Sequence, residues 1–173
     1  MNIFVKIKRL NDFQFRKVKY FSVQFEGEEV NDFYDFLNRM EDIDEISDDL
    51  TNLMVWIEEI GDNYGAQQRF FRNESNTADV RALPPPHNQM KVKKIKVKDL
   101  RLYCMVLNEH VVFLFNGGIK TTDKAQKCPN VSPYFRRANQ LGSKIDQLIK
   151  GGELSLNANH TDIIYDENLE IEL

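Results

Sequence analysis

The sequence predicts a two-layer α+β fold in which an antiparallel sheet carries its helices on one face. Three features lead to this expectation: early segments that alternate with period two, two segments with helical periodicity, and three strand-like segments close together before a last helix. Strands and helices that are grouped rather than interleaved are typical of α+β architectures. The chain has 173 residues, of which 42% are hydrophobic and 29% charged, which suits a globular protein with one core of ordinary size.

The first third of the chain predicts a strand pair and then two helices. Residues 2–10 and 18–25 alternate in polarity, so we expect two strands or a hairpin there. Residues 28–40 and 47–60 place apolar side chains on one helical face and acids on the other. We expect Trp56 to anchor the second helix to the sheet.

A long loop over residues 64–90, broken by three consecutive prolines, separates these helices from a predicted three-stranded meander. Its strands are expected at 91–98, 100–107 and 110–116. The first of them alternates lysine with Val and Ile, which indicates one basic face and one core face. Asn-Glu between the second and third strands suits a tight turn.

The end of the chain predicts a helix over residues 132–150, closed by two glycines, and then an acidic tail. We therefore expect a single domain over residues 1–152, with the N-terminal strand or hairpin as an extension. The tail, residues 153–173, is expected either to add one edge strand or to remain a flexible end.

Charge is segregated along the chain. Residues 91–150 hold thirteen Lys/Arg against four Asp/Glu, a local balance of +9 in a chain of net charge −4. Clustered cations gain free energy from counterion release when they bind a polyanion, so a phosphate-bearing partner is expected. The acidic helices are better explained as a solvated outer surface.

Several function classes are disfavoured by the sequence. Apolar runs fall far short of a membrane span, the N-terminus is not a signal peptide, and the two cysteines do not make a disulfide framework. We therefore expect a cytoplasmic protein without membrane association. The sequence contains no glycine-rich phosphate loop, no metal-ligand spacing of its three histidines and no catalytic triad pattern. No cofactor and no metal are expected.

The segment from Lys94 to Lys124 carries a more specific signal. A basic strand leads into Leu100-Arg101-Leu102-Tyr103, a tight turn and an apolar strand that ends in Gly118-Ile119-Lys120-Thr121-Thr122. This order resembles the RelE/ParE toxin superfamily, most closely its HigB-like branch. The resemblance implies a RelE-like fold and the toxin of a type II toxin–antitoxin system. Its partners would be a cognate antitoxin and messenger RNA, free or on the ribosome.

RNA cleavage without metal needs a base for the 2′-hydroxyl proton, fixed positive charge for the phosphorane, and an acid for the leaving oxygen. Crowded lysines can act as bases because like charges lower their pKa, and arginine suits bidentate phosphate contact. The resemblance assigns the catalytic positions to Lys94, Lys96, Arg101 and Lys120. The residues expected to contact RNA around them are Lys91, Lys93, Lys98, Lys124, Arg136 and Arg137.

Two alternatives remain open at this point. Lysines on an edge strand also serve to block aggregation, and Arg101 among core residues can belong to a structural ion pair. The family's usual Tyr or His after the final basic loop is missing, so the general acid is unassigned. The chain is then either an endoribonuclease or a non-catalytic binding protein of the same fold, of which a ParE-type gyrase inhibitor is one form. The nuclease requires Lys94, Lys96, Arg101 and Lys120 to converge on one concave site. Scattering of these four side chains over separate surfaces, or an internal Arg101–carboxylate pair, would end the case for RNA cleavage.

Overall fold

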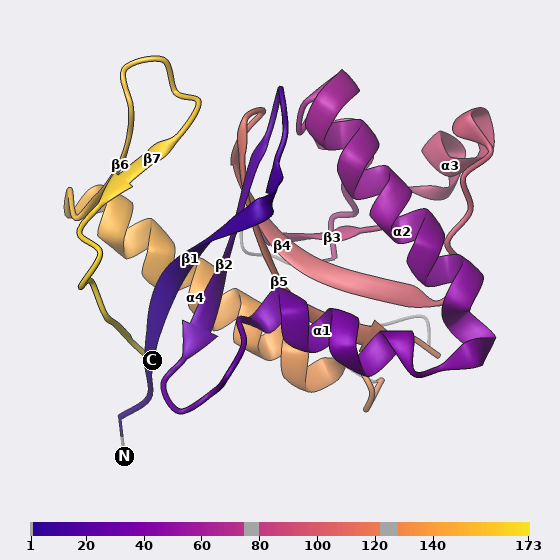
Figure 1. Cartoon of the computed structure of the whole chain (residues 1–173), viewed down its shortest axis with the longest axis horizontal. Coiled ribbons are helices and arrows are strands. Elements are labelled where there is room, and N and C mark those ends of the chain that lie inside the picture. Colours follow the sequence, from indigo (N-terminus) through magenta and orange to yellow (C-terminus); the bar gives the residue numbers. More distant parts are fainter. Residues whose placement is uncertain (1, 75–79, 122–127) are drawn as a thin grey trace.

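A curled six-stranded sheet forms the centre of the molecule, with strand order β3-β4-β5-β2-β1-β8 (Figure 1). The computed structural model describes residues 2–74, 80–121 and 128–173. β1 and β2 form the expected N-terminal antiparallel pair. The strands of the sheet are β1 Phe4–Gln14, β2 Lys19–Phe25, β3 Val80–Leu83, β4 Leu100–Asn108, β5 Val111–Ile119 and β8 Ile171–Glu172.

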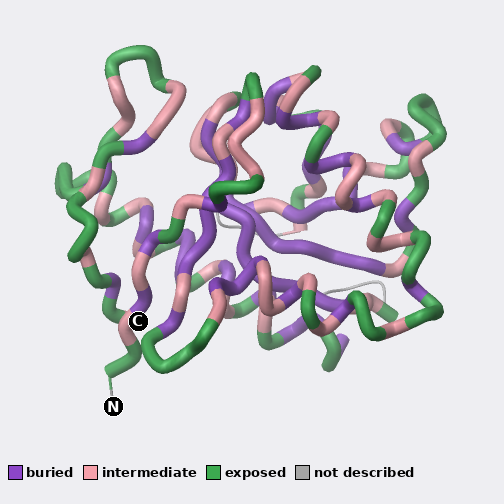
Figure 2. The backbone as a smooth tube through the Cα atoms, in the orientation of Figure 1, coloured by how far each residue is buried: buried purple, intermediate pink, exposed green. Residues whose placement is uncertain are grey.

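Helices cover both faces of this sheet, so the expected two-layer arrangement with helices on one face is wrong. Three helices lie against one face and share a core with it: α1 Asp32–Glu41, α2 Ser47–Glu59 and α3 His87–Lys93. The opposite face is covered by α4 Ser132–Lys150 and by a small hairpin of β6 Leu154–Leu156 and β7 Ile163–Tyr165. We call these the α2 side and the α4 side. Figure 2 shows the central strands almost wholly buried between them.

The two cores follow from side-chain alternation along fully buried strands. On β4, Leu102 and Cys104 face the α2 side, whereas Tyr103 and Met105 face the α4 side. Because both faces are apolar, the strand sequence reads as a continuous hydrophobic run. That run carries no signal for how many helical layers cover it.

The sheet is mixed rather than antiparallel. β2 pairs with β5 in parallel, with Tyr20 opposite Val112, while the β1–β2, β3–β4 and β4–β5 pairs are antiparallel. A parallel pair needs a long crossover, which α1, α2 and the two following strands supply. The prediction from the sequence covered only pairing between strands that follow one another in the chain, so it did not place the N-terminal pair in the sheet.

Residues 91–98 do not form the expected strand. The segment is the end of α3 followed by a loop that packs on α2, and the third strand of the meander is instead β3, inside the expected loop. The indole N–H of Trp56 donates to the carbonyl of Ile95 at 2.9 Å, and the amide of Asn52 donates to that of Lys96 at 2.7 Å. Side chains of α2 therefore take the place of ladder hydrogen bonds, and Trp56 anchors α2 as expected.

Other expectations hold at the level of single elements. α4 spans Ser132–Lys150 as predicted. The helix expected over residues 28–40 forms as α1 but starts at Asp32, because Asn31 caps it by accepting a hydrogen bond from the backbone N–H of Tyr34 at 2.9 Å. The acidic tail adds an edge strand, because β8 pairs with β1, and it also buries Leu154 and Ile163 on the α4 side. Within the described residues no helix is both long and apolar enough to span a bilayer.

Candidate functional site

The β4–β5 hairpin brings two of the four predicted catalytic residues together. Arg101 lies opposite Gly118 in the antiparallel register, and Lys120 follows directly after the end of β5. The backbone N–H of Lys120 donates to the carbonyl of Asp99 at 2.7 Å, which continues the pairing past the strand end. Arg101 alternates with Leu100 and Leu102, so its side chain faces the α4 side.

Both cations contact the same carboxylate oxygen of Glu74. The distance from Arg101 Nε to Glu74 Oε1 is 3.1 Å, and from Lys120 Nζ to the same oxygen 3.3 Å. The side chains of Arg101, Lys120 and Glu74 are 10%, 9% and 16% exposed, so this Glu74 triad is largely withdrawn from solvent. Arg101 also donates to the carbonyl of Leu100 at 2.8 Å.

The surroundings of the triad are cationic and incompletely hydrogen-bonded. Within the described residues, Glu74 Oε2 and the Tyr103 hydroxyl are buried without a hydrogen-bond partner. Burial, and then the charge of Glu74, raises the pKa of Tyr103, so this phenol stays protonated at neutral pH. Burial and the neighbouring charge of Arg101 lower the pKa of Arg72. Three cations thus face one carboxylate, an excess of positive charge suited to an anion.

Gly117 sets the close approach of the two strands beneath the triad. A Cβ at this position would collide with the carbonyl oxygen of Arg101 and would also meet the Leu102 backbone. The glycine therefore lets β5 lie tightly against the part of β4 that carries Arg101.

Lys94 and Lys96 are not brought to the triad. They are exposed in the loop that follows α3, which packs on the α2 side, whereas the triad faces the α4 side. Lys94 has a left-handed backbone with φ 59°, at the C-terminal end of α3. The four predicted catalytic cations therefore do not share one concave site.

Those of the remaining predicted RNA contacts that the structure describes lie in two places. Lys91, Lys93 and Lys98 are exposed beside Lys94 and Lys96, and we call these five residues the lysine segment. None of the five forms an ion pair with a described residue.

Arg136 and Arg137 lie on α4. The Arg136 guanidinium donates to the Ser132 hydroxyl, while that of Arg137 lies 3.6 Å from Asp32 and over the Phe25 ring. Arg137 is thus engaged within the fold. Lys124 lies outside the described residues.

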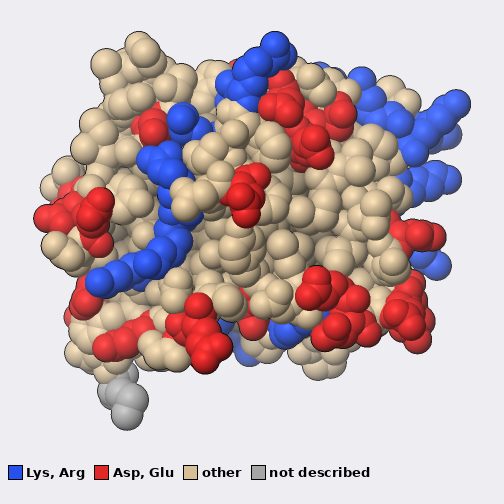
Figure 3. All heavy atoms as spheres, viewed as in Figure 1, with Lys and Arg blue, Asp and Glu red and all other residues tan. Residues whose placement is uncertain are grey.

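Basic side chains visible on one face of the molecule form a stripe at the left, a group at the top where β1 turns into β2, and a group at the right edge (Figure 3). The stripe at the left follows β1 and β2, and Lys6 and Lys8 occupy alternate positions of β1; the group at the right edge lies around α3. Acidic side chains lie between them, over α1 and α2. The N-terminal group was not among the predicted site residues, although its alternating lysines are plain in the sequence.

Glu74 and Tyr103 are the members of the candidate site that sequence reasoning missed. Glu74 lies in the segment expected to be an irregular loop, and its partners are 27 and 46 residues away. The sequence did contain a signal for Glu74, since it is the one acidic residue between positions 63 and 78 and so the nearest available counterion.

The described residues contain no group of three or more His, Cys, Asp or Glu arranged to hold a metal ion. No family model, curated protein or solved structure matches the chain.

Proposed function

We propose that the chain is a toxin-type, metal-independent messenger-RNA endoribonuclease with the Glu74 triad as its centre. The observation that carries the proposal is the convergence of Arg101 and Lys120 on a single carboxylate oxygen. Two fixed cations at one point are what a phosphorane needs, and a carboxylate beside them can accept a proton. As in the sequence-based expectation, a small antitoxin would cover the centre.

An incoming phosphodiester would compete with Glu74 for the two cations. Once phosphate takes Arg101 and Lys120, the carboxylate of Glu74 loses its ion pairs and is free to accept the 2′-hydroxyl proton. The 2′-oxygen then attacks phosphorus and the bond from phosphorus to the 5′-oxygen breaks, which leaves a 2′,3′-cyclic phosphate. The departing 5′-oxygen takes a proton from solvent water and becomes a 5′-hydroxyl end. No described residue is assigned as the acid for the leaving oxygen.

The lysine segment has a different role in this proposal. Five exposed lysines without described ion-pair partners form a strip of uncompensated charge, which supplies sequence-independent affinity for an RNA backbone. Since the strip lies on the α2 side, it contributes attraction and docking rather than chemistry. Lys94 and Lys96 are therefore proposed as docking residues.

The burial of the triad favours a second candidate, the non-catalytic binding protein. Ion pairs with side chains at most 16% exposed are common as structural contacts. The internal Arg101–Glu74 pair and the separation of Lys94 and Lys96 from it are the two arrangements that the sequence-based expectation set against RNA cleavage. The nuclease proposal therefore depends on phosphate displacing Glu74 from its two cations. In this case the chain binds nucleic acid, or gyrase in a ParE-like manner, and Glu74 only stabilises the hairpin.

Production of the chain in growing bacteria separates the two candidates. The nuclease should arrest growth and cut messenger RNA, and Arg101→Gln with Lys120→Gln should restore growth without lowering the thermal midpoint enough to unfold the protein at growth temperature. A matched control removes a cation from the exposed Lys150–Asp146 pair on α4 through Lys150→Gln. Growth arrest that persists in the folded double variant, or arrest with intact messenger RNA, would contradict the nuclease and support the binding protein.

A further inference from the structure

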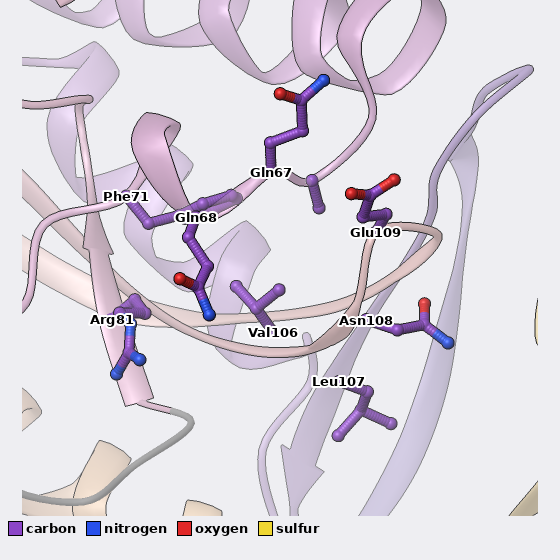
Figure 4. A pocket seen from close by; sticks show the side chains of 9 residues that line it. Gln67, Gln68, Phe71, Arg81, Val106, Leu107, Asn108 and Glu109 are labelled. Carbon is purple, nitrogen blue, oxygen red and sulfur yellow. The ribbon is translucent and has the colours of Figure 1, made fainter.

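A cavity of about 520 Å³ lies beside the outer end of β4, under the segment 66–71 (Figure 4). It is separate from the Glu74 triad, because no residue of the triad lines it and the segment above it belongs to the α2-side core. Its volume falls within the range of roughly 300–1,000 Å³ that is usual for small-ligand sites. The side chains that matter for recognition are those of Gln67, Gln68, Arg81, Val106, Leu107 and Glu109.

The two ends of the cavity carry opposite charges. Figure 4 shows Arg81 at one end and Glu109 at the other. Arg81 forms no ion pair with a described residue, and its guanidinium is engaged by the backbone carbonyl of Val80 at 3.2 Å. Glu109 is exposed in the β4–β5 turn, with its carboxylate unpaired within the described part of the chain. An occupant should therefore offer an anion to Arg81 and N–H donors to Glu109.

The separation of the two charges sets the length of the occupant. Arg81 lies opposite Cys104 in the β3–β4 register, five residues before Glu109 along β4. At about 3.3 Å per strand residue this is roughly 16 Å between backbone positions. With two side chains reaching in, that span suits a mononucleotide with its phosphate and base at opposite ends and is too long for phosphate alone.

The middle of the cavity combines an apolar surface with one free amide. Val106 is half-buried, packs against the α2-side core and presents its aliphatic side chain to the cavity, whereas Leu107 lines the edge of the cavity and packs against the α4-side core. The amide of Gln68 lies between Arg81 and Val106 and forms no hydrogen bond with a described residue (Figure 4). The amides of Gln67 and Asn108, by contrast, are already engaged. An apolar floor with one amide suits the face of a base and the polar atoms of a ribose.

We propose that this cavity binds a guanine nucleotide, with the phosphate on Arg81 and the base edge on Glu109. Guanine is favoured among the bases because its ring and exocyclic N–H groups together can donate to the two oxygens of one carboxylate. The site does not depend on the nuclease proposal, since it uses none of that centre's residues.

Isothermal titration of the full chain with GMP, guanosine, AMP and inorganic phosphate tests the site. GMP should bind saturably, and more tightly than AMP or phosphate. Arg81→Gln should lower the affinity for GMP at least about tenfold, to that of the parent protein for guanosine, because the charge-assisted contact with the phosphate is lost. Glu109→Gln should remove the preference for GMP over AMP. Lys150→Gln and Glu58→Gln, whose side chains do not line the cavity, are the matched controls.

Several outcomes would overturn the assignment. Absence of saturable GMP binding at millimolar concentration would do so, as would phosphate that binds as tightly as GMP. Control variants that lose as much affinity for GMP as Arg81→Gln does would also overturn it. Binding lost in Arg101→Gln with Lys120→Gln, but kept in Arg81→Gln, would move the nucleotide to the Glu74 triad. Thermal unfolding of each variant separates a lost contact from a lost fold.

Discussion

Asp32 shows how burial changes the chemistry of a single carboxyl group. It lies in the first turn of α1 with one oxygen unpartnered within the described residues, and Arg137 approaches the other at 3.6 Å. Burial raises the pKa of Asp32 to about 6; the charge of Arg137 opposes the shift and that of Asp35 adds to it. Since the folded-state pKa exceeds the ordinary value, the folded protein binds this proton more tightly than the unfolded chain does.

The contribution of Asp32 to stability should therefore fall as pH rises from about 4 to 6 and stay low above that. A pKa shift of this size lowers the free energy of unfolding by about 3 kcal/mol between the pH at which Asp32 is protonated and the pH at which it is ionised. Asp32→Asn removes the penalty, so its stability relative to the parent should rise between pH 4 and pH 7. Urea unfolding at both pH values measures this, with Glu153→Gln as the exposed control. An Asp32→Asn difference that is the same at both pH values would contradict the assigned pKa.

Gly117 lies where β5 approaches the backbone of β4 most closely, so the free energy of unfolding should be sensitive to a side chain there. Gly117→Ala places a methyl group against the Arg101 carbonyl, so the β4–β5 pair has to separate. We expect a loss of about 1–3 kcal/mol in the free energy of unfolding, as is usual for overpacking. Denaturant unfolding measures the loss, and unchanged stability would show that the hairpin yields without cost.

Among the elements, α4 is the one whose extent was predicted best, and residues 91–98 were predicted worst. The apolar stripe and the flanking proline and glycines mark α4 over five turns, which leaves little ambiguity. Residues 91–98 offer only one short alternation, which a short helix followed by a loop reproduces equally well. β3 was missed because four residues ending at a proline carry almost no periodicity.

The packing of α4 should carry a large part of the stability of its side of the sheet. Leu141 is fully buried there and Gln140 is exposed on the same helix. Leu141→Ala should lower the free energy of unfolding by about 2–5 kcal/mol, whereas Gln140→Ala should change it little. Chemical denaturation of the two variants side by side measures the contrast. Equal effects would mean that α4 does not pack on the sheet as described.

At the scale of the whole molecule, long-range pairing is what the sequence left open. Arg101 and Lys120 could be predicted as neighbours because one hairpin joins them. Their counterion Glu74 could not be placed, because the sequence alone does not show which opposite charges lie near it until the order of the strands in the sheet is known. Likewise, Lys94 and Lys96 were expected beside Arg101, and the sheet separates them from it.

The charge segregation of the molecule predicts how RNA binding responds to salt. Replacing Lys93, Lys94 and Lys96 by Gln should weaken binding to single-stranded RNA. It should also reduce the slope of log affinity against log salt by up to about 2, at roughly 0.7 per lost phosphate contact. Filter binding or fluorescence anisotropy across a salt series measures this. Lys17→Gln with Lys144→Gln and Lys150→Gln, which also removes three positive charges, is the matched control, and equal slopes in both variants would exclude the lysine segment as the RNA-docking strip.

The central claim is that the Glu74 triad cuts messenger RNA, and primer extension on a message in a translating bacterial extract tests it most directly. The extract covers both free and ribosome-bound RNA. The chain should produce discrete new 5′ ends, Glu74→Gln and Arg101→Gln should each abolish them, and Lys150→Gln should leave them unchanged. Uncut message with the folded parent chain, or the same cuts with folded Glu74→Gln and Arg101→Gln, would contradict the account.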